Sequence, residues 1–104
     1  MKVLNLTLKR EYFNQILSGK KKEEYRQTKL FWIERFTYAN GKYKHFDEIL
    51  FRNGYRPNAP FMRVEFLGFG PKTILTGSGF LGGKECFVLK LGKILEVGNI
   101  GEKQ

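Results

Sequence analysis

The sequence predicts a single α+β domain, residues 1–104, with a small curled β-sheet or barrel of mixed or antiparallel strands and two short helices in its N-terminal half. A chain of 104 residues suits one domain with its own core. Apolar residues make up 41% and aromatic residues 15% of the chain, which excludes a disordered protein. Short runs of alternating apolar residues recur, and helical spacing is confined to the segment before the Asn40-Gly41 turn.

The N-terminal part is predicted as strand, helix, strand and helix. Residues 3–9 alternate apolar with polar side chains, which is typical of a half-buried strand and lacks the continuous apolar run of a signal peptide. Residues 11–17 have helical spacing, and Gly19 follows as a stop because glycine adopts the left-handed conformation readily. The side chains expected to pack this helix on the sheet are Tyr12, Phe13, Ile16 and Leu17. Alternation returns over residues 20–26 and helical spacing over residues 29–37.

The rest of the chain is predicted as strands joined by loops. The strands are residues 46–53, 61–69 and 86–91, the last extended over residues 93–97 past a bend at Gly92. Pro57 and Pro60 mark a loop, since each removes a backbone donor. A glycine-rich loop is expected over residues 68–83, with a short strand at residues 73–75, and a frayed tail over residues 101–104.

The charge of the chain favours a polyanionic partner. The formal net charge is +9, and residues 1–45 carry 11 Lys or Arg against 4 Asp or Glu, a net +7. Nucleic acid therefore leads the candidate partners, with a generally basic surface as the alternative. No apolar run is long enough to span a membrane. The single Cys86 is expected in the core, and it excludes an internal disulfide, which suits the cytoplasm.

Two features that resemble catalytic motifs have the wrong context. Residues 77–82 have the form G-x-G-x-x-G, but a dinucleotide site needs a helix after the glycines, and a strand is predicted from Lys84 onward. We interpret them as a connecting loop, with a phosphate cradle as the alternative. His45 is the only histidine and has no candidate nucleophile near it, so it is expected at the surface. With no second histidine and no spaced cysteines, no metal site and no cofactor are expected.

The end of the strand at residues 46–53 carries a first set of candidate binding residues. Asn53 offers a donor and an acceptor side by side, Arg52 offers a planar fork for phosphate or a base, and Tyr55 offers a stacking face. The alternative is an Asn-Gly turn at Asn53-Gly54 with incidental charges.

The most specific motif is Gly19-x-Lys21-x-x-Glu24-x-Arg26. This G-x-K-x-x-E-x-R spacing, directly after a strand and a helix, resembles the motif of the ASCH domain of small bacterial and phage proteins. That family is a branch of the PUA-like superfamily of small β-barrels. The similarity covers most of the chain and includes residues 4–6, 12–19, 46–55 and 87–94.

The resemblance implies an RNA- or nucleotide-binding module with a basic cleft at the mouth of the barrel. Lys21, Glu24 and Arg26 are then the expected cleft residues. One branch of the family hydrolyses N(4)-acetylcytidine with the motif lysine, a threonine three residues after it and a glutamate from a later loop. Lys21 matches that lysine, whereas Glu24 stands at the threonine position and the later glutamate cannot be placed.

Three hypotheses follow from the sequence. The first is recognition of RNA or a nucleotide, with side chains from the motif and from the strand end as walls and aromatic residues as stacking surfaces. The expected ligand-binding residues are Lys21, Glu24, Tyr25, Arg26, Trp32, Arg52, Asn53 and Tyr55. The second is a hydrolase, an amidohydrolase acting on a modified nucleoside or a ribonuclease, with Lys21 and Glu24 as catalytic residues. The third is a protein-interaction domain. On strict alternation Lys21 faces away from Glu24 and Arg26, so the first hypothesis requires a bulge or twist.

Overall fold

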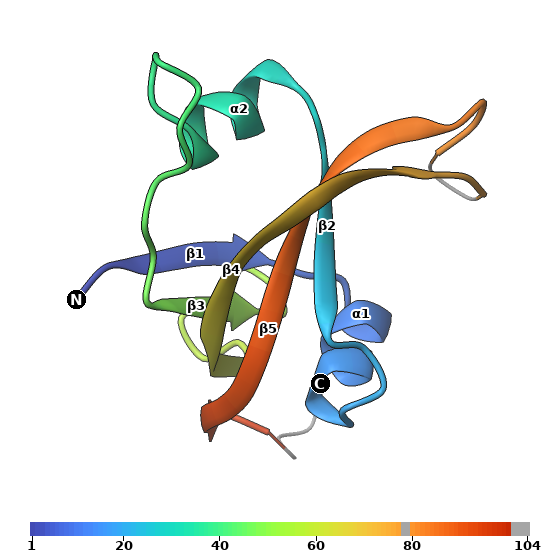
Figure 1. The fold of residues 1–104 in the computed structure, drawn as a ribbon. Coiled ribbons are helices and arrows are strands. Elements are labelled where there is room, and N and C mark those ends of the chain that lie inside the picture. The colour runs from blue at the N-terminus through green and yellow to red at the C-terminus, as the bar shows by residue number, and fades with distance from the viewer. Residues whose placement is uncertain (78–79, 101–104) are drawn as a thin grey trace.

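The chain folds into one mixed sheet with two helices, which confirms the predicted α+β class (Figure 1). The structure, a computed structural model, describes residues 1–77 and 80–100. In chain order the elements are β1 (Val3–Thr7), α1 (Arg10–Leu17), β2 (Glu23–Gln27), α2 (Leu30–Phe36), β3 (Glu48–Arg52), β4 (Phe61–Leu75) and β5 (Lys84–Gly98). The five strands lie in the order β1-β3-β4-β5-β2. The pair β1 and β3 is parallel and the other pairs are antiparallel. Within the described residues the sheet is open, with β1 and β2 at its edges.

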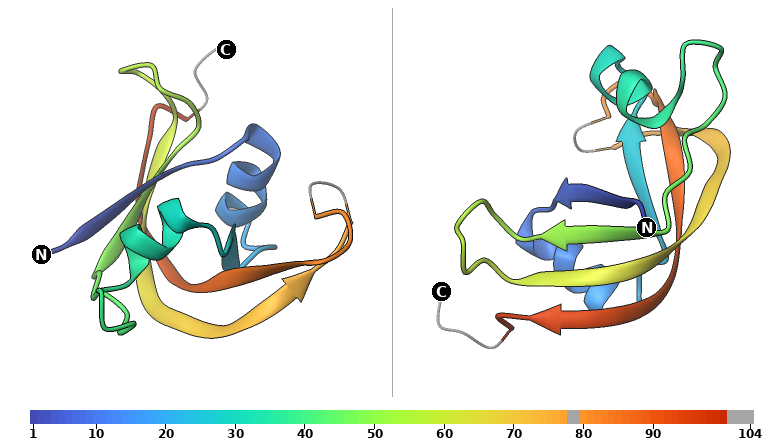
Figure 2. Two further views of the ribbon diagram at one scale, coloured as in Figure 1. Left: turned by 90° about the horizontal axis from the view of Figure 1, so that it is seen from above. Right: turned by 90° about the vertical axis from the view of Figure 1, so that its left-hand side faces the viewer.

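The long hairpin of β4 and β5 gives the sheet its curvature (Figure 2). Each strand has 15 residues, and their pairing shifts register at several points between Arg63 and Thr73. Such bulges bend a strand and increase its twist. As a result, the first part of β4 pairs with β3, while the first part of β5 pairs with β2.

The predicted glycine-rich loop is wrong over residues 68–72, because β4 continues to Leu75, and the strand predicted at residues 73–75 is the end of β4. Gly68 has φ +107 and lies at one of the register shifts. At Gly70 a Cβ atom would lie 2.9 Å from Cε of Lys90, so the missing side chain makes room for that lysine on β5. Glycines inside a strand often mark such bulges and close approaches. Residues 78–79 of the predicted connecting loop and the predicted tail, residues 101–104, lie outside the described residues.

The core lies between the helices and the concave side of the sheet. Its aromatic centre is Phe36 of α2, a fully buried ring that contacts Phe69 of β4 and Phe87 of β5. Cys86 is buried as predicted, and burial raises the pKa of its thiol. No helix among the described residues has the length and apolar character required to cross a membrane.

Candidate functional site

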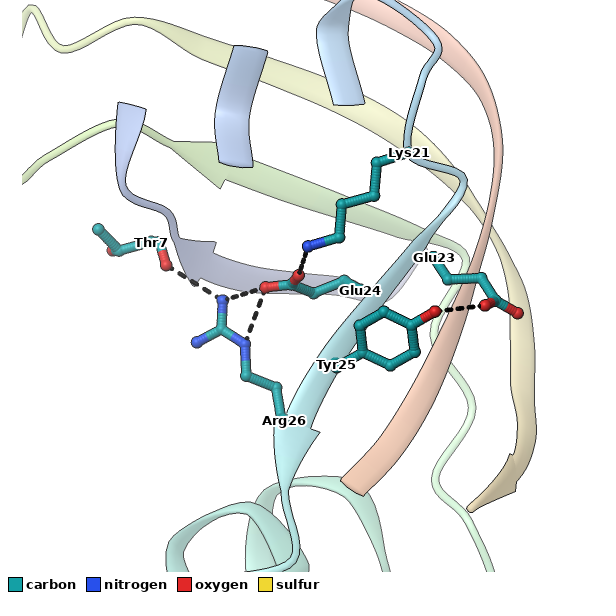
Figure 3. A network of polar contacts seen from close by, with 6 residues as sticks. All are labelled: Thr7, Lys21, Glu23, Glu24, Tyr25 and Arg26. Atoms are coloured by element: carbon teal, nitrogen blue, oxygen red, sulfur yellow. Dashed lines mark hydrogen bonds and ion pairs between the residues drawn. The ribbon is translucent and has the colours of Figure 1, made fainter. Parts of the chain in front are cut away.

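The centre of the candidate site is Glu24, a carboxylate that is only 4% exposed (Figure 3). Its Oε1 accepts a hydrogen bond from Lys21 Nζ at 3.0 Å. Its Oε2 accepts two from Arg26, at 3.1 Å from Nε and 2.8 Å from Nη2. A buried charge is tolerated only when it is paired and hydrogen-bonded, and both conditions are met here. The motif residues Lys21, Glu24 and Arg26 therefore form one ion-paired cluster, the motif triad.

Local structure explains how the triad forms without the bulge that strict alternation required. Glu24 and Arg26 are two residues apart on β2, so their side chains leave the same face of the strand. Lys21 lies before the strand, which begins at Glu23 and not at residue 20 as predicted. The backbone N–H of Lys21 donates to the carbonyl of Gln15 in α1, at 3.0 Å. Alternation therefore does not govern the direction of the Lys21 side chain.

Arg26 is fixed by contacts on two further sides. Its Nη2 also donates to the backbone carbonyl of Thr7 at the end of β1, at 3.1 Å. Its guanidinium lies 4.8 Å from the ring centroid of Trp32, a cation–π contact. Trp32 in turn stacks on Phe36 in the core, at 5.3 Å between centroids. Trp32 was predicted as a stacking surface for a ligand. In the structure it does not line the triad pocket but contacts Arg26 and joins it to the core.

Lys21 lies between two tyrosine rings. Its Nζ is 4.7 Å from the ring centroid of Tyr12 in α1 and 5.6 Å from that of Tyr25 in β2. The expectation that Tyr12 packs α1 on the sheet is wrong, since its side chain is 36% exposed and only Phe13 and Ile16 of that helix are buried. Tyr12 instead forms an aromatic wall beside the triad.

The triad opens on a pocket of about 470 Å³, here called the triad pocket. Its lining includes three aromatic residues together with the motif cations and Glu24. The lining residues are Thr7, Leu8, Lys9, Tyr12, Lys21, Glu24, Tyr25, Arg26, Gln27 and Phe80. Phe80 reaches it from the connection between β4 and β5. Aromatic faces beside cations and a carboxylate are suited to a planar, polar ligand.

No family model, curated protein or solved structure matches this chain. Within residues 1–77 and 80–100, no group of three or more His, Cys, Asp or Glu side chains is arranged to hold a metal ion.

The candidate residues at the end of β3 do not line the triad pocket. Asn53 Nδ2 donates to the carbonyl of Leu8 at 3.0 Å, which ties the end of β3 to the end of β1. Arg52 is half-buried and pairs in register with Thr7. Tyr55 is 91% exposed. Leu8 and Thr7 both line the pocket, so Asn53 and Arg52 are joined to residues of its wall but do not line it themselves.

Sequence reasoning missed several wall residues, of which the most important are Tyr12 and Phe80. Phe80 lies inside the G-x-G-x-x-G stretch, where an isolated aromatic residue among glycines was the available signal. Tyr12 carried a weaker signal, because it is the one member of the predicted helical stripe with a polar end.

Tyr25 should titrate unusually late. Its hydroxyl donates to Oε1 of Glu23 at 2.7 Å, and this hydrogen bond, together with burial and the charges of Glu23 and Glu24, raises its pKa from 10.0 to about 12. A raised pKa in the folded state means that the associated stability is present below pH 10.0 and is lost as the pH rises toward about 12. Tyrosinate absorbance of the wild-type protein minus that of Tyr25→Phe should show this late titration.

The same titration in Glu23→Gln provides the control. Removing the acceptor charge should return the pKa of Tyr25 toward the ordinary value for tyrosine, because the hydrogen bond to Glu23 is the largest cause of the shift. An unchanged titration in Glu23→Gln would contradict this assignment. At neutral pH the phenol stays protonated and keeps its hydrogen bond to Glu23.

Proposed function

We propose that this chain is an RNA- or nucleotide-binding module of the ASCH type and that its strongly curved sheet belongs to the PUA-like class of barrels. The observation that carries the proposal is the motif triad, a buried carboxylate held between two cations at an aromatic pocket of about 470 Å³. The three residues of the G-x-K-x-x-E-x-R motif meet there although Lys21 lies outside the strand.

The triad keeps hydrogen-bonding capacity for a ligand. A carboxylate has about four acceptor positions, and Glu24 uses three of them, which leaves one on Oε1. In the contacts among the described residues, Arg26 donates from Nε and Nη2, so its Nη1 remains for a ligand. Lys21 has two donors beyond the one directed at Glu24. One acceptor beside several donors suits the edge of a nucleobase, and the tyrosine rings supply stacking faces.

The same contacts favour recognition over hydrolysis. Both oxygens of Glu24 are already hydrogen-bonded to cations, which weakens it as a general base. Glu24 also occupies the position at which the amidohydrolase branch carries its threonine, and it is the one carboxylate among the described residues that line the triad pocket. Hydrolysis by that mechanism would need a nucleophile from elsewhere.

Binding of short RNA oligonucleotides and mononucleotides should weaken as salt rises. Each phosphate neutralised on a single strand contributes about −0.7 to the slope of log K against log salt. Lys21→Ala should weaken binding about tenfold, because it removes a charge-assisted hydrogen bond of about 1.5 kcal/mol while Glu24 keeps both hydrogen bonds from Arg26. Fluorescence anisotropy across a salt series measures both effects.

Tyrosine variants provide a matched comparison. Tyr12→Ala should weaken binding by about tenfold, since stacking on an aromatic ring contributes about 1–3 kcal/mol per base. Tyr55→Ala removes the same side chain outside the pocket and should leave the affinity unchanged. Lys42→Ala, at an exposed lysine outside the pocket, is the charge control for Lys21→Ala. Absence of binding at low salt, or equal losses in Tyr12→Ala and Tyr55→Ala, would refute the proposed function.

A further inference from the structure

A second hollow adjoins the triad pocket and is rich in lysine. Its volume is about 810 Å³, and we call it the lysine recess. Its lining residues are Gln15, Lys20, Lys21, Lys22, Glu23, Tyr25, Leu67, Lys90 and Leu91. Four lysines and one glutamate give it a net formal charge of +3. Lys21 and Tyr25 line both hollows, so they form the partition between them.

The lysines project from backbone that is already fixed. The segment between α1 and β2 is tied at Lys21, whose N–H donates to Gln15 of α1, and at Lys22, whose carbonyl accepts from Leu91 of β5, each at 3.0 Å. Gly19, with φ +81, makes the turn that brings the segment away from the helix. Little backbone freedom therefore remains to be lost when an anion binds to this segment.

Lys90 approaches the recess from β5. It pairs in register with Glu23 of β2 and Gly68 of β4, so it lies on the strand between them. Its side chain passes over Gly70, where a Cβ would lie 2.9 Å from Cε. The absence of a side chain at Gly70 leaves the path of Lys90 open.

Lys21 is paired with Glu24, but the other three lysines of the recess have no acidic partner among the described residues. Among the ion pairs of the described residues, none involves Lys20, Lys22 or Lys90. Glu23, the acidic residue among the described lining residues, accepts a hydrogen bond from the hydroxyl of Tyr25. Several unpaired ammonium groups around one hollow favour a multiply charged anion, and lysine binds phosphate as a compact point charge.

We infer that the lysine recess holds a phosphate group of the same nucleotide whose base occupies the triad pocket. The inference rests on the proposed function and deepens it, since it makes the ligand a phosphorylated nucleotide or an RNA strand and not a free nucleoside. The shared partition of Lys21 and Tyr25 is the structural reason, because a ligand that reaches around it contacts both hollows. The triad pocket recognises the base, and the lysine recess neutralises the charge of the phosphate.

The test compares ligands that differ only in phosphate. The wild-type protein is titrated calorimetrically, at constant ionic strength, with the four common ribonucleosides, their 5′- and 3′-monophosphates, inorganic phosphate and short RNA without terminal phosphates. At least one monophosphate, or the RNA, should bind about tenfold or more tightly than the corresponding nucleoside. Preference for a monophosphate identifies a terminal phosphate as the bound group, and preference for the RNA identifies an internal phosphodiester.

The decisive variant is the double substitution Lys20→Ala and Lys90→Ala. Both side chains are exposed, so the fold should be retained, which circular dichroism checks. The double variant should lose the phosphate-dependent gain, about tenfold, and keep the nucleoside affinity of the wild type. Lys42→Ala with Lys93→Ala changes the net charge equally at exposed residues outside both hollows and should have no such effect.

Three results would overturn the inference. Equal affinity for nucleosides, monophosphates and RNA, unchanged in the Lys20→Ala and Lys90→Ala protein, would leave the proposed function standing and remove the phosphate site. Binding of inorganic phosphate as tight as that of the nucleotides would make the recess an independent anion site. No binding of any nucleoside, nucleotide or RNA would refute the proposed function as well.

Discussion

Phe36→Ala should lower the free energy of unfolding by about 4 kcal/mol, the usual range for a fully buried phenylalanine being about 3–5 kcal/mol. Phe36 is 0% exposed, and its ring lies 5.1 Å from that of Phe69 and 5.2 Å from that of Phe87. It therefore joins α2 to both strands of the long hairpin. Truncation leaves a cavity that three separate elements line. Urea unfolding followed by circular dichroism measures the change from the midpoint, provided that the m-value is preserved.

Phe31 in the same helix is the matched control. Phe31 is 55% exposed and forms a T-shaped contact with Trp32, so Phe31→Ala should lower the stability by less than about 1 kcal/mol. Similar losses of stability in the two variants would contradict the assignment of Phe36 as the side chain that packs α2 against the core. The Phe36 variant should also weaken ligand binding, because Trp32 stacks on Phe36 and supports Arg26.

The sequence was sufficient to predict the order of the elements and the position of the motif. Period-two and helical spacing located both helices and β1 to within a few residues. The motif spacing identified Lys21, Glu24 and Arg26, and these three side chains contact one another. Alternation places Glu24 and Arg26 on one face of β2, whereas Lys21 lies before the strand, where alternation does not apply.

The failures came from contacts between distant parts of the chain. Residues 68–72 were predicted as part of a loop because the stretch is rich in glycine, whereas pairing with β5 stabilises a continuous strand and Lys90 requires the space at Gly70. Tertiary pairing therefore overrode local propensity.

The same reason explains the composition of the pocket wall. Tyr12, Thr7 and Phe80 meet the triad only because α1, β1 and the connection between β4 and β5 come together in space. Asn53 was predicted as a base reader from its chemistry, yet its amide donates to the Leu8 carbonyl. The Asn53 amide was correctly identified as a hydrogen-bond donor, but its acceptor, the Leu8 carbonyl, lies 45 residues away in the sequence.

Glu24→Gln should both destabilise the protein and weaken nucleotide binding. Neutralising Glu24 leaves Lys21 and Arg26 without a counter-charge, with side chains that are only 19% and 16% exposed. Breaking a buried ion pair from one side costs about 3 kcal/mol or more when burial is complete, so a loss of about 2–3 kcal/mol is expected here. The two cations would also lose the orientation that Glu24 imposes, and the affinity for RNA should fall about tenfold or more. Urea unfolding and anisotropy on the same samples measure the two effects.

Substitution of the other buried carboxylate among the described residues, Glu48, distinguishes an effect on stability from an effect on binding. Glu48 is 8% exposed and accepts two hydrogen bonds from Arg63, at 2.8 and 3.1 Å, but it lines neither the triad pocket nor the lysine recess. Glu48→Gln should destabilise the fold less than Glu24→Gln, because Arg63 keeps its pair with Glu96, and it should leave nucleotide affinity unchanged. If both variants lost binding in proportion to their lost stability, Glu24 would be a structural ion pair and the triad would have no role in recognition. If Glu24→Gln alone lost binding at a temperature where both proteins are folded, the buried charge would be part of the binding site.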